Sequence, residues 1–349
     1  MSFESTKDTK SEAKRHHYVP KCYLKNFCSG DKLYYLNLEN IQRKGFRSFA
    51  KKCHPRTICT EDYYYKIPSE DVQMTSFSLN QWDSLFVENE VLQSTEREYG
   101  RLFTLITSGQ EISIDDANLF CDFLVQLKMR NPYHAKTYTI ETLENVMEIL
   151  LTELDHPGAP FANMDKEIKK AVAKQMLDEN REDPDLKKKL QLQSLIHSYE
   201  NINRRIKFRN ALCKLRWHVL RAPENGTRYI TSDNPGFVFL NDQTFYNLKL
   251  TGEGFLFLPL SSTYCLAIDL TEQEIVDVAK VTSKRILHSS NSSKAVEYVN
   301  ARSCQLINNV VISSDQALLN KLSEKLQKYV KRDGDNWLNS FFTVNQTGN

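Results

Sequence analysis

Two adjacent histidines stand near the start of the chain, in the segment RHHYVPKCYLKNF at positions 15–27. Neutral imidazole can bind a metal ion or accept a proton near pH 7, so His16 and His17 are candidates for catalysis or metal binding. Neighbouring residues on an extended strand point to opposite faces, and only one of the two side chains can then face a given site. The alternative is structural, with His16 exposed and His17 held by a hydrogen bond.

A regular spacing of residues between positions 85 and 103 predicts a helix with a carboxylate on its apolar face. The spaced residues are Leu85, Asn89, Leu92, Glu96, Tyr99 and Phe103. Because a carboxylate on such a face is costly unless it is paired, Glu96 needs a partner, and Arg130 on the next predicted helix is the obvious one. One interpretation of the two residues is a structural ion pair between helices. Alternatively, Glu96 is an acid/base carboxylate and Arg130 binds a phosphate. Gln126 lies one helical turn before Arg130.

Polar residues also follow a strand-like run at ITSDNP, positions 230–235. Polar groups at the end of a buried strand commonly line a cleft. Ser232 and Asn234 are therefore candidates for substrate contacts, and Asp233 is a candidate metal ligand or acid/base group. Alternatively, Asp233 closes an Asx-turn with its own backbone.

The period of the hydrophobic pattern changes along the chain and predicts an α+β fold. KLYYLNLEN at 32–40 and DYYYKIP at 62–68 are typical of strands. One helix is predicted from about 80 to TSGQ at 107–110, and a second to 131, with Ser113 or Asp115 as its N-cap. Further helix is predicted over 135–155 and over about 161–221. Short strand-like runs follow between 228 and 270, and helix returns over 293–329. The predicted order is N-terminal strands, a helical middle, and a C-terminal antiparallel or mixed sheet with terminal helices.

The domain organisation follows from the same pattern. Residues 1–14 are polar and predict a disordered leader. Residues 15–349 predict a single α+β domain, in which 160–205 is a protruding helical insertion. The charged helices at 161–200 are a solvated face or a surface for a protein partner.

The composition excludes several classes of protein. The net charge of +2 gives no global attraction for nucleic acid or membranes, although RRIKFRNALCKLRWHVLR at 204–221 is a local basic candidate for a nucleic-acid backbone. No apolar run approaches the roughly 20 residues of a membrane span, and no secretory signal is visible, which predicts a cytoplasmic protein without membrane contact. The eight cysteines contain no C-x-x-C and are predicted to be free thiols.

Several short motifs occur together in one order: HHYVP at 16–20, Gln126-x-x-x-Arg130-x-Pro132, TSDNP at 231–235 and PLS at 259–261. Together they resemble DUF4238, a bacterial family of unknown function, over about residues 15–310. The sequence departs from the family pattern at 21–22, where Lys-Cys replaces Gln-Phe, and at Ser262, where a second proline is common. The resemblance implies no activity. It implies a bacterial or phage-related cytosolic protein in which the histidines, the Gln126–Arg130 helix and the TSDNP turn line one cleft.

The leading hypothesis is a cytosolic phosphodiester hydrolase acting on nucleic acid or a nucleotide, as a metal-dependent, nuclease-like effector in bacterial defence. The predicted catalytic residues are His16, His17, Glu96 and Asp233. The predicted substrate-binding residues are Gln126, Arg130, Ser232 and Asn234. His17 and Asp233 are the candidate ligands for a divalent metal, Mg²⁺ or Mn²⁺. RNA or DNA would be the partner. The alternatives are a non-catalytic sensor module that recognises a nucleotide, a peptide or a phage component, and a buried structural network of the same residues.

Overall fold

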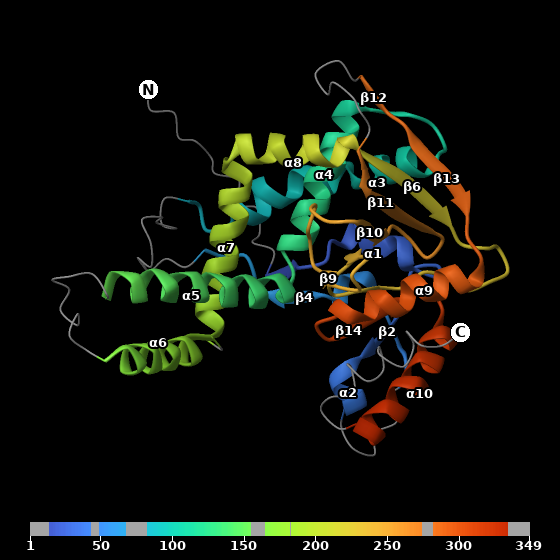
Figure 1. Cartoon of the computed structure of the whole chain (residues 1–349). Coiled ribbons are helices and arrows are strands. Elements are labelled where there is room, and N and C mark those ends of the chain that lie inside the picture. Colours follow the sequence, from blue (N-terminus) through green and yellow to red (C-terminus); the bar gives the residue numbers. More distant parts are fainter. Residues whose placement is uncertain are drawn as a thin grey trace, which may run out of the picture.

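The computed structural model describes residues 14–42, 49–67, 82–154, 165–181, 183–273 and 282–333. Helices and strands are both present, and the fold is α+β as predicted (Figure 1). The helices are α1 (Lys21–Leu24), α2 (Leu38–Gln42), α3 (Gln93–Thr107), α4 (Ile114–Met129), α5 (Pro132–Leu154), α6 (Lys166–Arg181), α7 (Pro184–Glu200), α8 (Ile202–Lys214), α9 (Ser293–Ser303) and α10 (Gln316–Asp333). A π-helical segment, η4 (Val87–Leu92), leads into α3, and short 3-10 turns are η1 (Lys25–Phe27), η2 (Pro55–Thr57) and η6 (Cys304–Leu306).

A six-stranded sheet organises the second half of the chain. Its strand order is β13-β6-β11-β10-β8-β9, with β13 parallel to β6 and the other neighbours antiparallel. The strands are β6 (Leu215–Arg221), β8 (Phe237–Leu240), β9 (Phe245–Tyr246), β10 (Gly254–Pro259), β11 (Tyr264–Gln273) and β13 (Ile286–Ser290). The predicted helix over 161–221 is therefore wrong at its end. Trp217 and Val219 are buried while Arg216 and His218 are half-buried, which is the two-residue period of a strand.

Both faces of this sheet are covered. Helices α1, α3 and α4 pack on one face, where Phe120 and Leu124 join the cluster that contains Trp217 and Val238. Helix α9 covers the other face and contributes to the cluster that contains Phe237. Burial on two sides explains why β8 is apolar at every position, FVFL, and does not alternate with polar residues.

A four-stranded antiparallel sheet, β3-β2-β14-β7, joins the two ends of the chain. Its strands are β2 (Leu33–Asn37), β3 (Lys51–Cys53), β7 (Thr231–Ser232) and β14 (Val310–Ser313), and helices α2 and α10 pack beside it. Strand β14 lies inside the region predicted as helix, 293–329. The prediction is wrong there because α9 ends at Ser303 and Val310–Ser313 pairs with β2 and β7.

Two small ladders complete the strands: β1 (Arg15–His17) with β4 (Thr60–Asp62), and β5 (Ile112–Ser113) with β12 (Ser283–Lys284). The strand predicted at 62–68 is wrong after Asp62, which ends β4: a turn follows at 63–65, in which Tyr63 has a φ of 54°, and Pro68 lies outside the described residues. Tyr64 and Tyr65 pack into one cluster with α7 and η4, whereas a strand would separate them onto two faces.

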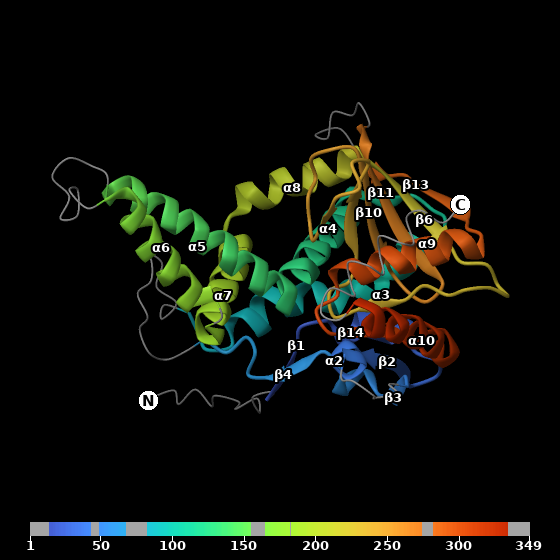
Figure 2. The same ribbon diagram turned by 60° about the horizontal axis from the view of Figure 1, so that its bottom comes forward.

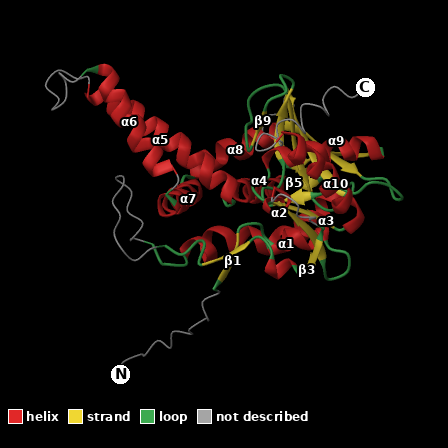
Figure 3. Ribbon diagram, turned by 90° about the horizontal axis from the view of Figure 1, so that it is seen from below, coloured by secondary structure: helices red, strands yellow, loops and turns green. Residues whose placement is uncertain are grey.

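Helices α5 and α6 extend away from the sheets as an antiparallel pair (Figures 2 and 3). Helix α7 returns along the body and packs against α5 and η4, and α8 then crosses toward β6. The single domain and the insertion at 160–205 stay predictions, and residues 1–13 of the predicted leader lie outside the described residues. No helix within the described ranges is both long and apolar enough to cross a membrane.

The buried ammonium of Lys128 connects α4 to the turn between β7 and β8. Its Nζ donates to Asn234 Oδ1 at 2.9 Å, to Pro235 O at 2.9 Å and to Gly236 O at 2.7 Å. Gly236 has a φ of 77°, and a Cβ there would lie 2.8 Å from the carbonyl oxygen of Phe257. Burial lowers the pKa of Lys128 well below its ordinary value, but the three acceptors occupy all three ammonium donors.

We expect Lys128→Met to lower the free energy of unfolding by about 3 kcal/mol, because it leaves two buried carbonyl groups without their donor. Urea denaturation measures the loss, with Lys174→Met on the exposed face of α6 as the control. A loss for Lys128→Met no larger than that of the control would contradict a structural role for the ammonium.

Candidate functional site

Arg130, the residue that ends α4, is the centre of the first group of predicted site residues. Its side chain is only 1% exposed. The guanidinium donates to Glu96 Oε1 at 2.6 Å, to the backbone oxygen of His17, and to the hydroxyl of Tyr65 at 3.3 Å. Burial lowers the pKa of Arg130, but Glu96 and Tyr65 raise it by more, so the net pKa lies above its ordinary value. The predicted pairing of Glu96 with Arg130 is therefore present.

The two histidines point to opposite faces of β1 and have different partners. His16 is fully buried, its Nδ1 accepts from the backbone N–H of Tyr65 at 3.0 Å, and its ring stacks on the Tyr65 ring. The structural alternative placed His16 at the surface, and that placement is wrong. The Nε2 of His17 lies 3.1 Å from Pro55 O. Burial lowers the pKa of His17, which keeps its imidazole neutral near pH 7.

Asp233 binds a backbone segment that comes much later in the sequence. Its carboxylate accepts from the backbone N–H groups of Asn308 at 3.0 Å, Asn309 at 2.6 Å and Val310 at 2.9 Å. Burial raises the pKa of Asp233 to about 6, against the opposing effect of these three donors. These contacts hold the segment that enters β14 beside β7. They differ from the Asx-turn considered for this residue, because its partners lie on another segment.

Ser232 and Asn234 are buried in the same turn. The Ser232 hydroxyl donates to Asn234 O at 2.9 Å and accepts from Asn234 N at 3.1 Å. The Asn234 amide donates to Leu306 O, and its oxygen accepts from Asn131 Nδ2 at 3.0 Å as well as from Lys128. All hydrogen-bonding atoms of the two side chains thus have protein partners.

The predicted residues form two groups that meet at the end of α4. His16, His17, Glu96 and Arg130 make up one group around Tyr65, and Ser232, Asp233 and Asn234 make up the other. Asn131, next to Arg130 in the chain, bonds Asn234 and connects them. Within the described ranges, no three His, Cys, Asp or Glu side chains are placed to hold a metal ion. The catalytic and metal-binding roles of these residues stay predictions.

Gln126 holds the π-helical segment against α4. Its Nε2 donates to Val91 O at 2.7 Å, and its Oε1 accepts from the Thr95 hydroxyl. Gln126 is also the one residue of the predicted set that lines the cavity described next.

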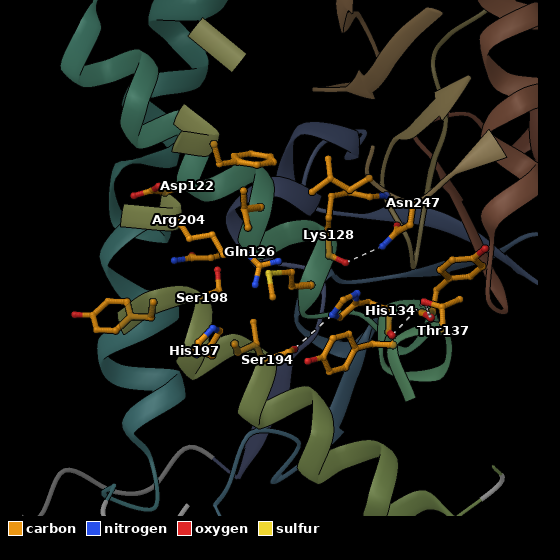
Figure 4. A pocket seen from close by; sticks show the side chains of 18 of the residues that line it. Asp122, Gln126, Lys128, His134, Thr137, Ser194, His197, Ser198, Arg204 and Asn247 are labelled. Atoms are coloured by element: carbon orange, nitrogen blue, oxygen red, sulfur yellow. Dashed lines mark hydrogen bonds between the residues drawn. The ribbon is translucent and has the colours of Figure 1, made fainter. Parts of the chain in front are cut away.

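A cavity of about 450 Å³ opens between α4, α5, α7, α8 and the segment around β9 (Figure 4). Its size is within the range typical of small-molecule sites, about 300–1,000 Å³. Six aromatic side chains contribute to its lining: Tyr133, Tyr138, Tyr199, Phe208, Phe245 and Tyr246. Aromatic faces at this density suit a planar ligand.

Arginines of α8 give one side of the cavity a positive charge. Arg205 donates to Asp122 at 2.7 Å and to Tyr199 O at 3.3 Å, and its guanidinium lies over the Tyr199 ring. Arg209 binds the same carboxylate through two nitrogens. Arg204 is exposed at the mouth, and within the described part of the chain its guanidinium has no hydrogen-bond or ion-pair partner. Arg205 is thus held in place, while Arg204 remains open to an anionic ligand.

The opposite side of the cavity carries polar groups from α5 and α7. His134 Nε2 and Ser194 Oγ point toward each other at 3.4 Å (Figure 4). Burial, and to a lesser extent the charge of Lys128, together lower the pKa of His134 to about 4. Asn247 donates to Lys128 O at 3.1 Å, and its side-chain oxygen is buried without a hydrogen-bond partner among the described residues.

Sequence reasoning missed most of this cavity. His134 and Ser194 are sixty positions apart, with no spacing that would associate them. The basic stretch at 204–221, a candidate contact for a nucleic-acid backbone, did point to part of the cavity, because Arg204 and Arg205 line it.

The comparisons with known proteins give a family but no activity. The family model described as protein of unknown function (DUF4238) matches residues 15–317. The chain belongs to this family. The DUF4238 match extends from β1 into α10 and includes both the cavity and the Arg130 group. No curated protein and no solved structure matches the chain. The function must therefore be argued from the geometry.

Because of His134, we expect the free energy of unfolding to fall in acid. The folded pKa of His134, about 4, lies below the unfolded value of 6.5, so its contribution is complete above pH 6.5 and is lost as the pH falls through 4. Between pH 7 and pH 5 we expect this group to remove about 2 kcal/mol of unfolding free energy. Urea denaturation at the two pH values measures the loss. His134→Asn, which cannot titrate, should show a correspondingly smaller difference, and an equal difference would contradict the prediction.

Proposed function

We propose that this protein binds a nucleotide, or one nucleotide unit of a nucleic acid, in the cavity between α4, α5, α7 and α8. The observation that carries the proposal is the combination of aromatic side chains with an open guanidinium, Arg204, around one cavity. A nucleotide joins an aromatic base to an anionic phosphate through its sugar, and the lining offers a surface for the base and for the phosphate.

The aromatic side chains suit the base. Tyr133 and Tyr138 come from α5, and Phe245 and Tyr246 come from β9 on the other side of the cavity. Stacking of a base on an aromatic ring contributes about 1–3 kcal/mol and does not depend strongly on which base is bound.

The arginines suit the phosphate. A guanidinium matches the geometry of phosphate oxygens and binds them in bidentate fashion. Arg205 is held by Asp122 and Tyr199 and therefore keeps its charge at the cavity wall without further ordering. Arg204 completes the anion site from the mouth. The position of Asp122 beneath both Arg205 and Arg209 leaves this wall with a net positive charge.

Binding can be tested by isothermal titration calorimetry with the four nucleoside monophosphates. We expect Arg204→Ala and Tyr138→Ala each to raise Kd about tenfold or more, since each removes about 1.4 kcal/mol or more of interaction. Lys174→Ala on α6 is the control and should leave Kd unchanged. Absence of binding for all four nucleotides, or equal Kd values in all variants, would contradict the proposal.

Hydrolysis of a phosphodiester is the second candidate, favoured by the pair of Ser194 and His134 in the same cavity. A neutral His134 can take the hydroxyl proton as Ser194 Oγ attacks phosphorus, and can return it to the leaving oxygen when the P–O bond breaks. Water then releases the phosphoryl group from the serine. A cytosolic location and a role in bacterial defence stay predictions of the sequence.

Cleavage is measured by incubating the protein with RNA, single-stranded DNA and nucleotides, in Mg²⁺, Mn²⁺ or EDTA. We expect Ser194→Ala to abolish product formation while nucleotide binding persists, because only the nucleophile is lost. His17→Ala and Asp233→Ala test the residues chosen from the sequence. Product formation that survives Ser194→Ala but stops with those two variants, or with EDTA, would move catalysis to the predicted histidine and carboxylate. No product under any condition would leave binding as the function.

A further inference from the structure

Helix α8 carries an unusual excess of positive charge. Its thirteen residues, INRRIKFRNALCK, contain five arginines or lysines and no acidic residue. Arg205 and Arg209 are balanced in part by Asp122 on α4. The other three cations, Arg204, Lys207 and Lys214, have no ion-pair partner within the described part of the chain.

These three cations lie along one face of the helix. They are separated by three and seven residues, spacings that bring side chains onto the same side of an α-helix. Arg204 lines the cavity mouth and Lys207 is exposed one turn further on. From Arg204 to Lys214 the helix rises about 15 Å. The line of charge therefore begins at the cavity and continues away from it toward β6 (Figure 1).

We infer that the ligand of the cavity is one unit of a single strand of RNA or DNA, and that the phosphates of its neighbouring nucleotides follow α8. The inference rests on the nucleotide binding proposed above. A free mononucleotide would need only Arg204 and Arg205, and Lys207 and Lys214 would have no role in its binding. A strand that continues past the mouth uses all of these charges.

A cavity of this size favours a single strand over a duplex. A base must leave its stack and its pair to enter a pocket lined by aromatic rings, and this is least costly when the strand is already unpaired. A positive groove that follows the backbone, combined with aromatic stacking of individual bases, is the general arrangement for single-strand binding. The overall charge of +2 hides this local surface, because acidic residues elsewhere balance it.

The test compares an 8-nucleotide single strand with a nucleoside monophosphate, using fluorescence anisotropy for the strand and calorimetry for the mononucleotide. We expect the full-length protein to bind the strand at least tenfold more tightly than the mononucleotide. Lys207→Gln/Lys214→Gln should weaken strand binding about tenfold and leave mononucleotide binding unchanged. The slope of log K against log salt should fall by about 1.4 in magnitude, because two phosphate contacts are removed.

The matched control is Lys170→Gln/Lys174→Gln, which removes two exposed charges from α6 and should change neither affinity. If the mononucleotide binds as tightly as the strand, or the α8 double variant has no effect on the strand, the inference fails and the proposed nucleotide site stands. If neither ligand binds, both fail. Equal binding of a duplex, or an equal loss of heparin binding in the α8 double variant, would identify α8 as a general polyanion surface and would also overturn the inference.

Discussion

The structure depends on one buried helix, α4, whose polar side chains each bind a different part of the chain. Asp122 binds the arginines of α8, Gln126 binds η4, Lys128 binds the turn after β7, and Arg130 binds α3 and β1. Each of these groups would be costly inside the protein without its partner. Because each partner lies on a different element, the hydrogen bonds and ion pairs of these side chains fix those elements relative to one another. The cavity lies among the elements that α4 holds together.

This constraint also explains how the predicted site residues differ from the groups that line the cavity. Arg130, Asp233 and Asn234 bind backbone atoms and buried side chains, and they hold loops and strand ends in register. In the cavity, the Arg204 guanidinium has no hydrogen-bond or ion-pair partner among the described residues, and the side-chain oxygen of Asn247 is buried without one. The exposed guanidinium of Arg204 is a charged group of the cavity lining that a ligand can reach, and this is the basis for placing function there.

The features of the fold and site that depend on local sequence pattern could be predicted from the sequence. The apolar stripe with Glu96 pointed to Arg130, because a carboxylate on that face requires a partner. The α+β order followed from periodicity, and capping chemistry offered Ser113 or Asp115 as the N-cap of the helix that is α4, of which the structure has Ser113. Strand β6 was predicted as helix because its basic residues continue the composition of α8, although its burial has a period of two. The partners of Asp233 lie 75 or more residues away, and the cavity combines residues from six segments of the chain, so no local pattern could reveal either.

The most direct measurement of the central claim is the position of a bound nucleotide. 4-Thiouridine monophosphate can be cross-linked to the protein by light and the labelled peptides identified by mass spectrometry. We expect labels on the segment that carries Tyr133 and Tyr138, or on the segment that carries Phe245 and Tyr246. The label should be lost when unlabelled nucleotide competes. Labels confined to the segments around His17, Arg130 or Asp233 would contradict this expectation and would place the site at the residues chosen from the sequence.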